Sequence, residues 1–349
     1  MLIIRVVHGG AGIHSVGSEP EVKAALLGAC DSAANSLSAL DAVETAIAFL
    51  EDSTVLNAGS GSNLTIDGTV ECDAAIMDGL TGDFGSVGAV SAVKNPITVS
   101  RLILERSRKP DPVGRIPPIT LVSVGAHAFA RQSATHLIVE EESMVTPRAR
   151  KQWKIWKDRL ETMSNPDHAM QDTVGAIAWN EISGEIASGV SSGGILLKYS
   201  GRIGEAAVFG AGCWAQTREG GVRMACSVSG TGEYIIKTSL ARHFGAALSD
   251  HSDPDVHAII ERVLVHDFWV PSRNASNPDP SAGVIVLTTE KDEEGQEKGR
   301  LWCGFTTPSF AIAFASPRSR PESYILRRPK AIESRPNDHA RVFVTAFAL

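Results

Sequence analysis

The strongest constraint on the fold is a series of short β-rich segments that begins directly after Thr173. These segments cover residues 174–179, 185–192, 207–215 and 222–229, and turns that contain glycine separate them. A parallel pair of strands needs a crossover connection of about a dozen or more residues, usually a helix, and the turns are too short for one. The pattern therefore favours antiparallel pairing over a doubly wound parallel sheet.

The rest of the chain alternates between helical and strand patterns. Apolar residues recur at helical spacing from Glu21 to Leu50, where two helices broken near residues 35–39 are expected. Further helices are expected over residues 96–107, 121–132, 233–248 and 254–268, and further strands over 2–7, 87–93, 283–289, 301–306 and 310–315, with two short ones within 57–79. The HGGAG sequence at residues 8–12 suggests a tight loop, and residues 140–171 suggest a charged surface segment.

This order of elements predicts an α/β (α+β) fold. Two sheets that share one core, each covered by helices, bury every apolar face, which gives a four-layer αββα sandwich. With 43% hydrophobic and 21% charged residues, the composition is that of an ordinary globular protein. We therefore expect residues 1–349 to form a single domain.

Charge and cysteine content exclude several classes of function. The net charge of −7 gives no general attraction to nucleic acid or to an anionic membrane, and no segment reaches the roughly 18 to 20 apolar residues that cross a bilayer. Five scattered cysteines without CxxC spacing suggest neither a zinc site nor a disulfide framework. We expect an intracellular, cytoplasmic protein with no metal ligands, and the basic run from Arg148 to Arg159 leaves nuclear entry open.

The dipeptide Asp172-Thr173 is the candidate reactive site. A threonine hydroxyl is a weak nucleophile unless a base takes its proton, and a chain-terminal α-amine, with a pKa of about 8, can be that base. If the Thr173 hydroxyl attacked the peptide bond before it and that bond were hydrolysed, the amine would appear on the nucleophile's own residue. Spacing alone favours a plain buried strand threonine.

Several sequence blocks in one order support the reactive alternative. They are VVHGGAG at the start, NAGSGSNL, ECDAAIMDG, GRIPP, DTVGAIA, SSGG, GRIGEAAVFGAGCWA and SGTGE. Over nearly its whole length the chain resembles the N-terminal-nucleophile (Ntn) family of plant-type asparaginases, isoaspartyl peptidases and glycosylasparaginases. It is most similar to the threonine aspartase (taspase) branch, because Asp172 precedes the nucleophile where asparaginases usually have Gly.

The resemblance implies an Ntn-hydrolase fold and a set of catalytic roles. Cleavage between Asp172 and Thr173 would give an α-subunit of residues 1–172 and a β-subunit of residues 173–349 with Thr173 as nucleophile. Ser192 would hydrogen-bond the nucleophile and its amine. The Ser229 hydroxyl and the Gly230 backbone N–H would form the oxyanion hole. Asn57 would contact the nucleophile and order its loop.

The resemblance also implies how substrate is held. Arg202 would bind the carboxylate of an aspartyl or asparaginyl group, with Gly230 beside it. Glu205 stands where asparaginases use Asp to bind a free α-amine, so this contact is open to change. No cofactor is expected, because HGGAG lacks the ending of a phosphate-binding loop. The resemblance allows a structural sodium ion near the NAG loop and implies a homodimer of αβ units.

Three functions follow, in order of preference. The first is an autoprocessing threonine endopeptidase that cleaves proteins after aspartate, suggested by Asp172, Ser192, GRIPP and GCWA. The second is a plant-type asparaginase or isoaspartyl peptidase, favoured if Glu205 binds an α-amine. The third is an uncleaved, non-catalytic binding scaffold. Peptides that contain Asp or Asn are the expected partners of the first two.

Overall fold

We describe the protein from a computed structural model. It describes residues 2–162, 173–217, 223–249, 255–275, 277–291, 294–334 and 339–349. Within these residues the strands form two sheets that face each other.

The larger sheet contains the strand that directly follows Thr173. Its order is β12-β11-β1-β5-β6-β2-β3-β4. The bounds are β1 Ile3–Gly12, β2 Cys72–Asp78, β3 Phe84–Val90, β4 Thr120–Val122, β5 Val174–Asn180, β6 Ile186–Ser192, β11 Ser309–Ala315 and β12 Glu322–Arg327. Neighbours pair antiparallel except β3 and β4, which are parallel. This arrangement confirms the preference for antiparallel pairing over a doubly wound sheet.

The smaller sheet has the order β13-β10-β9-β8-β7. Its strands are β7 Cys213–Thr217, β8 Arg223–Gly230, β9 Ala282–Lys291, β10 Glu297–Phe305 and β13 Phe343–Ala348. All of its pairs are antiparallel. Its two inner strands β8 and β9 lie against β1 and β5 of the larger sheet.

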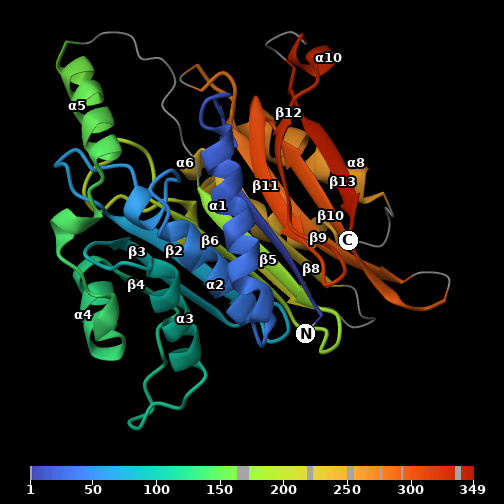
Figure 1. The fold of residues 1–349 in the computed structure, drawn as a ribbon, viewed down its shortest axis with the longest axis horizontal. Helices are drawn as coiled ribbons and strands as arrows, with labels where there is room; N and C mark the ends of the chain where they lie inside the picture. Colours follow the sequence, from blue (N-terminus) through green and yellow to red (C-terminus); the bar gives the residue numbers. More distant parts are fainter. Residues whose placement is uncertain are drawn as a thin grey trace.

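Helices cover the outer face of each sheet (Figure 1). Helices α1 Glu19–Ser32, α2 Ala39–Glu51 and α3 Pro96–Ser107 pack on the larger sheet, and α6 Gly232–Thr238, α7 Leu240–Ala247 and α8 Val256–Arg262 pack on the smaller one. Between the sheets lies a core that includes Ile4, Trp179, Leu287 and Phe305. The protein is therefore the four-layer αββα sandwich that the sequence predicts.

The prediction of a loop at HGGAG is wrong. The HGGAG sequence does not form a loop: β1 continues through it to Gly12, and its pairing with β11 shifts register between His8 and Ala11. As predicted, the described part of the charged segment, residues 140–162, lies largely at the surface, and it contains helix α5 Pro147–Thr162. Helix α5 is anchored because Trp153 Nε1 donates a 2.8 Å hydrogen bond to the Thr65 carbonyl.

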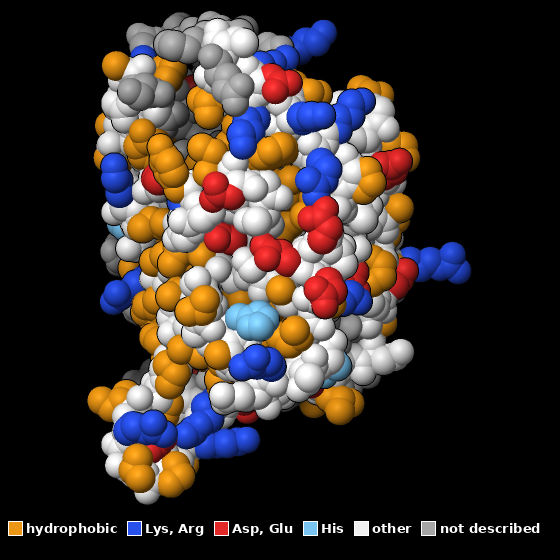
Figure 2. All heavy atoms as spheres, turned by 90° about the vertical axis from the view of Figure 1, so that its left-hand side faces the viewer, with side chains coloured by type: hydrophobic (Ala, Val, Ile, Leu, Met, Phe, Trp, Pro, Cys, Tyr) orange, Lys and Arg blue, Asp and Glu red, His pale blue; other side chains and the backbone are white. Residues whose placement is uncertain are grey.

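The remaining elements are short helices and single turns. They are α4 Ser123–Ser133, α9 Val270–Ser272, α10 Lys330–Glu333, the π-helical segment Val263–Trp269 that continues α8, and the 3-10 turns Ala33–Asn35, Gly59–Gly61, Thr135–Leu137, Glu141–Met144 and Glu205–Ala207. Figure 2 shows the face that carries α4 and α5, where Lys and Arg side chains lie near the upper and lower ends with acidic side chains between them. None of the described helices is both long and apolar enough to cross a membrane. All five cysteines are buried and free.

The two sheets lie close together at Gly175. Gly175 pairs with His8 on β1, and an ideal Cβ on Gly175 would lie 2.0 Å from Ser227 Oγ and 2.4 Å from His8 Nε2. These two atoms form a 2.9 Å hydrogen bond that joins β1 to β8 across the core. Burial lowers the pKa of His8 to about 3, so the ring is neutral at neutral pH.

The contact at Gly175 yields a stability prediction. Gly175→Ala should lower the free energy of unfolding by about 1 to 3 kcal/mol or more, because the added methyl group must separate the sheets or break the His8–Ser227 bond. Gly125→Ala is the control: it lies exposed on α4 with empty space around its Cβ position, and it should be neutral or gain up to ~1 kcal/mol. Denaturant titration measures both, and equal stabilities would contradict the prediction.

Candidate active site

Thr173 lies at the start of β5, which is the central pairing partner of β1 and β6. Side chains alternate along a strand, and Ile177 and Trp179 face the core between the sheets. Thr173 lies an even number of residues before both of them, so its side chain faces the second sheet as theirs do. Thr173 is only 4% exposed. Asp172 lies outside the described residues, and cleavage before Thr173 stays a prediction.

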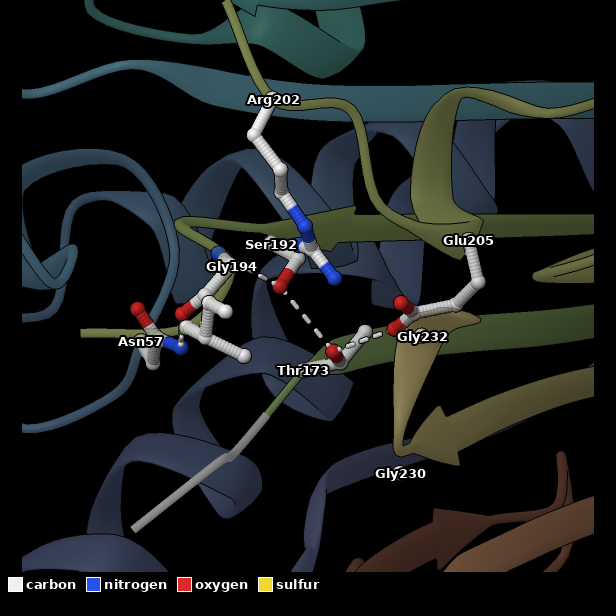
Figure 3. A pocket seen from close by; sticks show the side chains of 9 residues that line it. Asn57, Thr173, Ser192, Gly194, Arg202, Glu205, Gly230 and Gly232 are labelled. Atoms are coloured by element: carbon white, nitrogen blue, oxygen red, sulfur yellow. Dashed lines mark hydrogen bonds between the residues drawn. The ribbon is translucent and has the colours of Figure 1, made fainter. Parts of the chain in front are cut away.

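Two oxygen atoms contact the Thr173 hydroxyl. Its Oγ1 lies 3.0 Å from Ser192 Oγ and 2.7 Å from Glu205 Oε1. Ser192 ends β6, and its Oγ also accepts a 3.0 Å hydrogen bond from the Gly194 backbone N–H. Figure 3 shows the Ser192 and Glu205 side chains pointing toward Thr173 from two different segments. The structure therefore brings the predicted nucleophile and its predicted hydroxyl partner together.

Asn57 organises the loop that follows Ser192. Its Nδ2 donates a 2.9 Å hydrogen bond to the Gly194 carbonyl, and its Oδ1 accepts from the Asn63 backbone N–H at 2.8 Å. Its own carbonyl accepts from the Gly193 N–H. Asn57 thus lines the site and orders two loops, while none of these hydrogen bonds goes to Thr173 itself.

Arg202 enters the site already paired with a carboxylate. Its Nε and Nη2 donate hydrogen bonds of 2.9 and 2.7 Å to Glu233 Oε1. The Arg202 side chain is 13% exposed and that of Glu233 is 49% exposed. Gly232 makes room for the group, because an ideal Cβ there would lie 2.6 Å from Glu205 Oε2 and 2.8 Å from Arg202 Nη2.

A buried aspartate holds the segment that carries Arg202 and Glu205. Asp73 Oδ2 accepts a 2.7 Å hydrogen bond from the Gly204 N–H, and its Oδ1 accepts from the Ala89 N–H at 2.8 Å. Burial raises the pKa of Asp73, while the charge of Lys198 and these two backbone donors lower it. Lys198 is 1% exposed and its Nζ donates to the Glu71 carbonyl.

Of the two predicted oxyanion-hole residues, only Gly230 lines the pocket. Gly230 lines the pocket, with φ of +148°, a region that favours glycine. The Ser229 side chain instead faces the larger sheet, where its Oγ accepts a 3.0 Å hydrogen bond from the Ala11 N–H. The structure brings Gly230 to the pocket and leaves the Ser229 hydroxyl outside its lining. The oxyanion role of both residues stays a prediction.

The pocket at Thr173 is small. The space between its lining residues is about 210 Å³, including the part open to solvent. Its lining consists of Asn57, Thr173, Ser192, Gly194, Ile195, Arg202, Glu205, Gly230 and Gly232. A buried nucleophile, an acidic group and an arginine in so small a space suit hydrolysis of a small polar substrate.

The electrostatics of the pocket centre on Glu205. Burial raises the pKa of its carboxyl, while the hydrogen bond from Thr173 and the charge of Arg202 lower it, and the charge of Asp73 raises it further. A carboxyl with a raised pKa is a stronger base once it is ionised. Glu205 is therefore placed to exchange a proton with the Thr173 hydroxyl.

The αββα sandwich and a threonine hydroxyl at the head of a central strand define the class of the protein, an Ntn hydrolase. A profile of the family described as "Asparaginase" matches residues 1–270. The chain belongs to this asparaginase family. Relatives of the chain also include isoaspartyl peptidases.

Named relatives agree with this assignment. The plant-type L-asparaginase of Pyrococcus furiosus is 36% identical over 260 residues, which cover 69% of this chain and 78% of the relative. The isoaspartyl peptidase/L-asparaginases of Xenopus laevis and Danio rerio are 39% and 38% identical, covering 68% and 69% of this chain and 73% and 74% of the relatives. These names do not distinguish the threonine aspartase branch, which stays a prediction.

Sequence reasoning missed several residues that support the site. Asp73 lies in the ECDAAIMDG block and Glu233 in SGTGE, so the motifs contained them, but no spacing rule shows which side chain they meet. Glu51 is a third case: it is fully buried behind β6, where its Oε1 accepts hydrogen bonds from Ser191 Oγ at 2.6 Å and from the Ile97 N–H at 3.1 Å. Ser191 precedes Ser192 and faces the helix layer.

Glu51 makes stability depend on pH. Burial raises its pKa from 4.5 to about 8, so between these values the folded protein binds more protons than the unfolded chain. This contribution to stability is complete below about pH 4.5 and is lost as the pH rises toward 8, with a slope of at most about 1.4 kcal/mol per pH unit. Glu51→Gln keeps the acceptor oxygen and removes the titration. Its melting temperature should therefore fall less than that of the wild type from pH 5 to pH 8, and parallel curves would contradict this.

Proposed function

We propose that the chain is an autoprocessed amidohydrolase that acts on L-asparagine and on β-aspartyl (isoaspartyl) peptides. The observation that supports this function most strongly is the contact of the buried Thr173 hydroxyl with Ser192 and Glu205, beside Arg202. The asparaginase and isoaspartyl peptidase names of the relatives support the same substrate class.

Catalysis begins with the chain cut before Thr173. The new α-amine, whose ordinary pKa is about 8, accepts the proton of the Thr173 hydroxyl. The oxygen attacks the side-chain amide carbonyl of the substrate, the nitrogen leaves with a proton, and an ester forms on Thr173. Water then hydrolyses the ester and releases aspartate. Gly230 is assigned to stabilise the charged carbonyl oxygen through its backbone N–H.

Substrate recognition uses opposite charges at two positions. The guanidinium of Arg202 receives the substrate α-carboxylate, and the carboxylate of Glu205 receives the α-ammonium group. Glu205 is one methylene longer than aspartate, so it also reaches Thr173 Oγ1.

A threonine endopeptidase that cleaves after aspartate is the second candidate. Asp172 before the nucleophile, Ser192 in place of threonine and Glu205 in place of aspartate favour it. In this function Arg202 would bind the aspartate side chain of a protein. We also propose that αβ units pair into a homodimer and that catalysis uses no resident cofactor.

The proposed function predicts that the chain cleaves itself before Thr173. Intact-mass measurement of the purified protein should show fragments of residues 1–172 and 173–349, because the hydroxyl of Thr173 attacks the preceding peptide bond. Thr173→Ala should leave one chain, whereas Thr173→Ser keeps a hydroxyl and should still give two. An unbroken wild-type chain after long incubation would contradict the proposal and favour a binding scaffold.

The second prediction separates the candidate activities. Processed enzyme should release ammonia from L-asparagine and cleave β-aspartyl dipeptides, and it should leave aspartate-containing protein substrates intact. Arg202→Lys keeps the charge but loses the planar fork, so KM should rise by about tenfold or more with a smaller change in kcat. Cleavage of peptides after aspartate without turnover of the small substrates would reverse the order of the two candidates.

A further inference from the structure

Glu205 contacts the nucleophile directly. Its Oε1 lies 2.7 Å from Thr173 Oγ1, and the Glu205 side chain is only 3% exposed. This distance is typical of a hydrogen bond between a hydroxyl and a carboxylate. The proposed function uses the new α-amine as base, yet no such amine exists before the first cut. The first cut therefore needs another proton acceptor.

The hydrogen bonds around Thr173 depend on the protonation state of Glu205. A hydroxyl carries one proton, so Thr173 donates to one oxygen at a time. When Glu205 is ionised it accepts the Thr173 proton, and Ser192 can donate to the same Oγ1 while it accepts from Gly194. When Glu205 is protonated, it donates to Thr173 instead, and Thr173 donates to Ser192. Only the ionised state prepares the threonine oxygen for attack.

We infer that Glu205 is the catalytic base of the chain's own cleavage. The inference rests on the proposed function, because it concerns the step that creates the active enzyme. Glu205 takes the hydroxyl proton as Oγ1 bonds to the carbonyl carbon of residue 172, which lies outside the described residues. The carbon–nitrogen bond then breaks as the nitrogen of Thr173 takes that proton from Glu205. One water hydrolyses the resulting ester, which gives a carboxyl group on residue 172 and restores the hydroxyl beside its new amine.

The surroundings of Glu205 suit this role. Arg202 is the cation that faces it, and Asp73 is the acidic group whose charge acts on it. Glu233 shares Arg202 through two hydrogen bonds, so the arginine does not neutralise Glu205 alone. An aspartate at this position would end roughly 1.5 Å short of the threonine hydroxyl. The longer side chain is therefore what brings a carboxyl group into contact with the nucleophile.

The test follows cleavage of newly made full-length chain. The 349-residue protein is synthesised in a cell-free system with a short radioactive pulse, and the loss of intact chain is followed on denaturing gels. Glu205→Gln keeps the size of the side chain but removes the base, and it should slow cleavage by about 100-fold or more. Glu205→Asp should cleave at a rate between those of Glu205→Gln and the wild type. Glu44→Gln, which removes a partly buried carboxyl on α2, should match the wild type.

The pH profile provides a readout that a structural role would not change. The rate of wild-type cleavage should rise as Glu205 ionises, at a pH above the ordinary 4.5 of a glutamate, because burial raises its pKa. The charged groups around the Glu205 carboxyl are Arg202, Asp73 and Glu233. The residual cleavage of Glu205→Gln should lack that rise. Melting temperatures of both Glu205 variants, compared with Thr173→Ala, show whether they fold.

The possible outcomes separate the inference from the proposed function. A wild-type chain that never cleaves contradicts the proposed function itself. A wild type that cleaves while Glu205→Gln cleaves equally fast overturns only the role of Glu205 as base. A wild-type cleavage rate that does not change from pH 4.5 to pH 8 also overturns the role of Glu205 as base. This result holds even if the variants fail to fold. If Glu205 only binds the substrate amine, its variants should change KM for asparagine and leave the cleavage rate unaltered.

Discussion

The pairing of β5 on both edges is the constraint on which the site depends. Strand β1 fixes one edge and β6 the other, so the alternation of side chains along β5 directs every second residue between the sheets. Thr173 takes that direction at one end of the strand. Close to it, Gly175 lets β8 approach through the His8–Ser227 hydrogen bond. The alternation of side chains along β5 that builds the core between the sheets therefore also directs the Thr173 side chain into that space.

Buried charge is the second determinant of the site. Placing a carboxyl group in the protein interior is costly unless hydrogen bonds or opposite charges compensate it. Asp73 receives two backbone N–H groups and lies near Lys198, whereas Glu205 has Thr173 and the charge of Arg202. Asp73 therefore acts on the backbone and fixes the turn at Gly204, which sets where Glu205 begins. Because burial raises its pKa, the Glu205 carboxyl can take up and release a proton beside the Thr173 hydroxyl.

The sequence predicts the parts of this structure that depend on local pattern. Helices α1, α2 and α3 follow from apolar spacing, and α3 has the predicted bounds because Pro96 starts it. HGGAG was misinterpreted because glycine permits a loop but does not require one: β1 pairs with β11 as far as Gly12, with a local register shift. The pairs Arg202–Glu233 and Asp73–Gly204 join distant segments, and no local rule contains them.

Charge balance in the pocket bears on the choice of substrate. Arg202 already pairs with Glu233, and Glu205 lies beside them. Free asparagine brings one carboxylate and one ammonium group, so it adds no net charge while it gives each protein group a partner. An aspartate within a protein brings the carboxylate alone and leaves Glu205 without a cation of its own. In a buried site the unpaired carboxylate is costly. The pairing of charges therefore favours small zwitterionic substrates over an internal aspartate, unless Glu205 binds in the protonated form that its raised pKa allows.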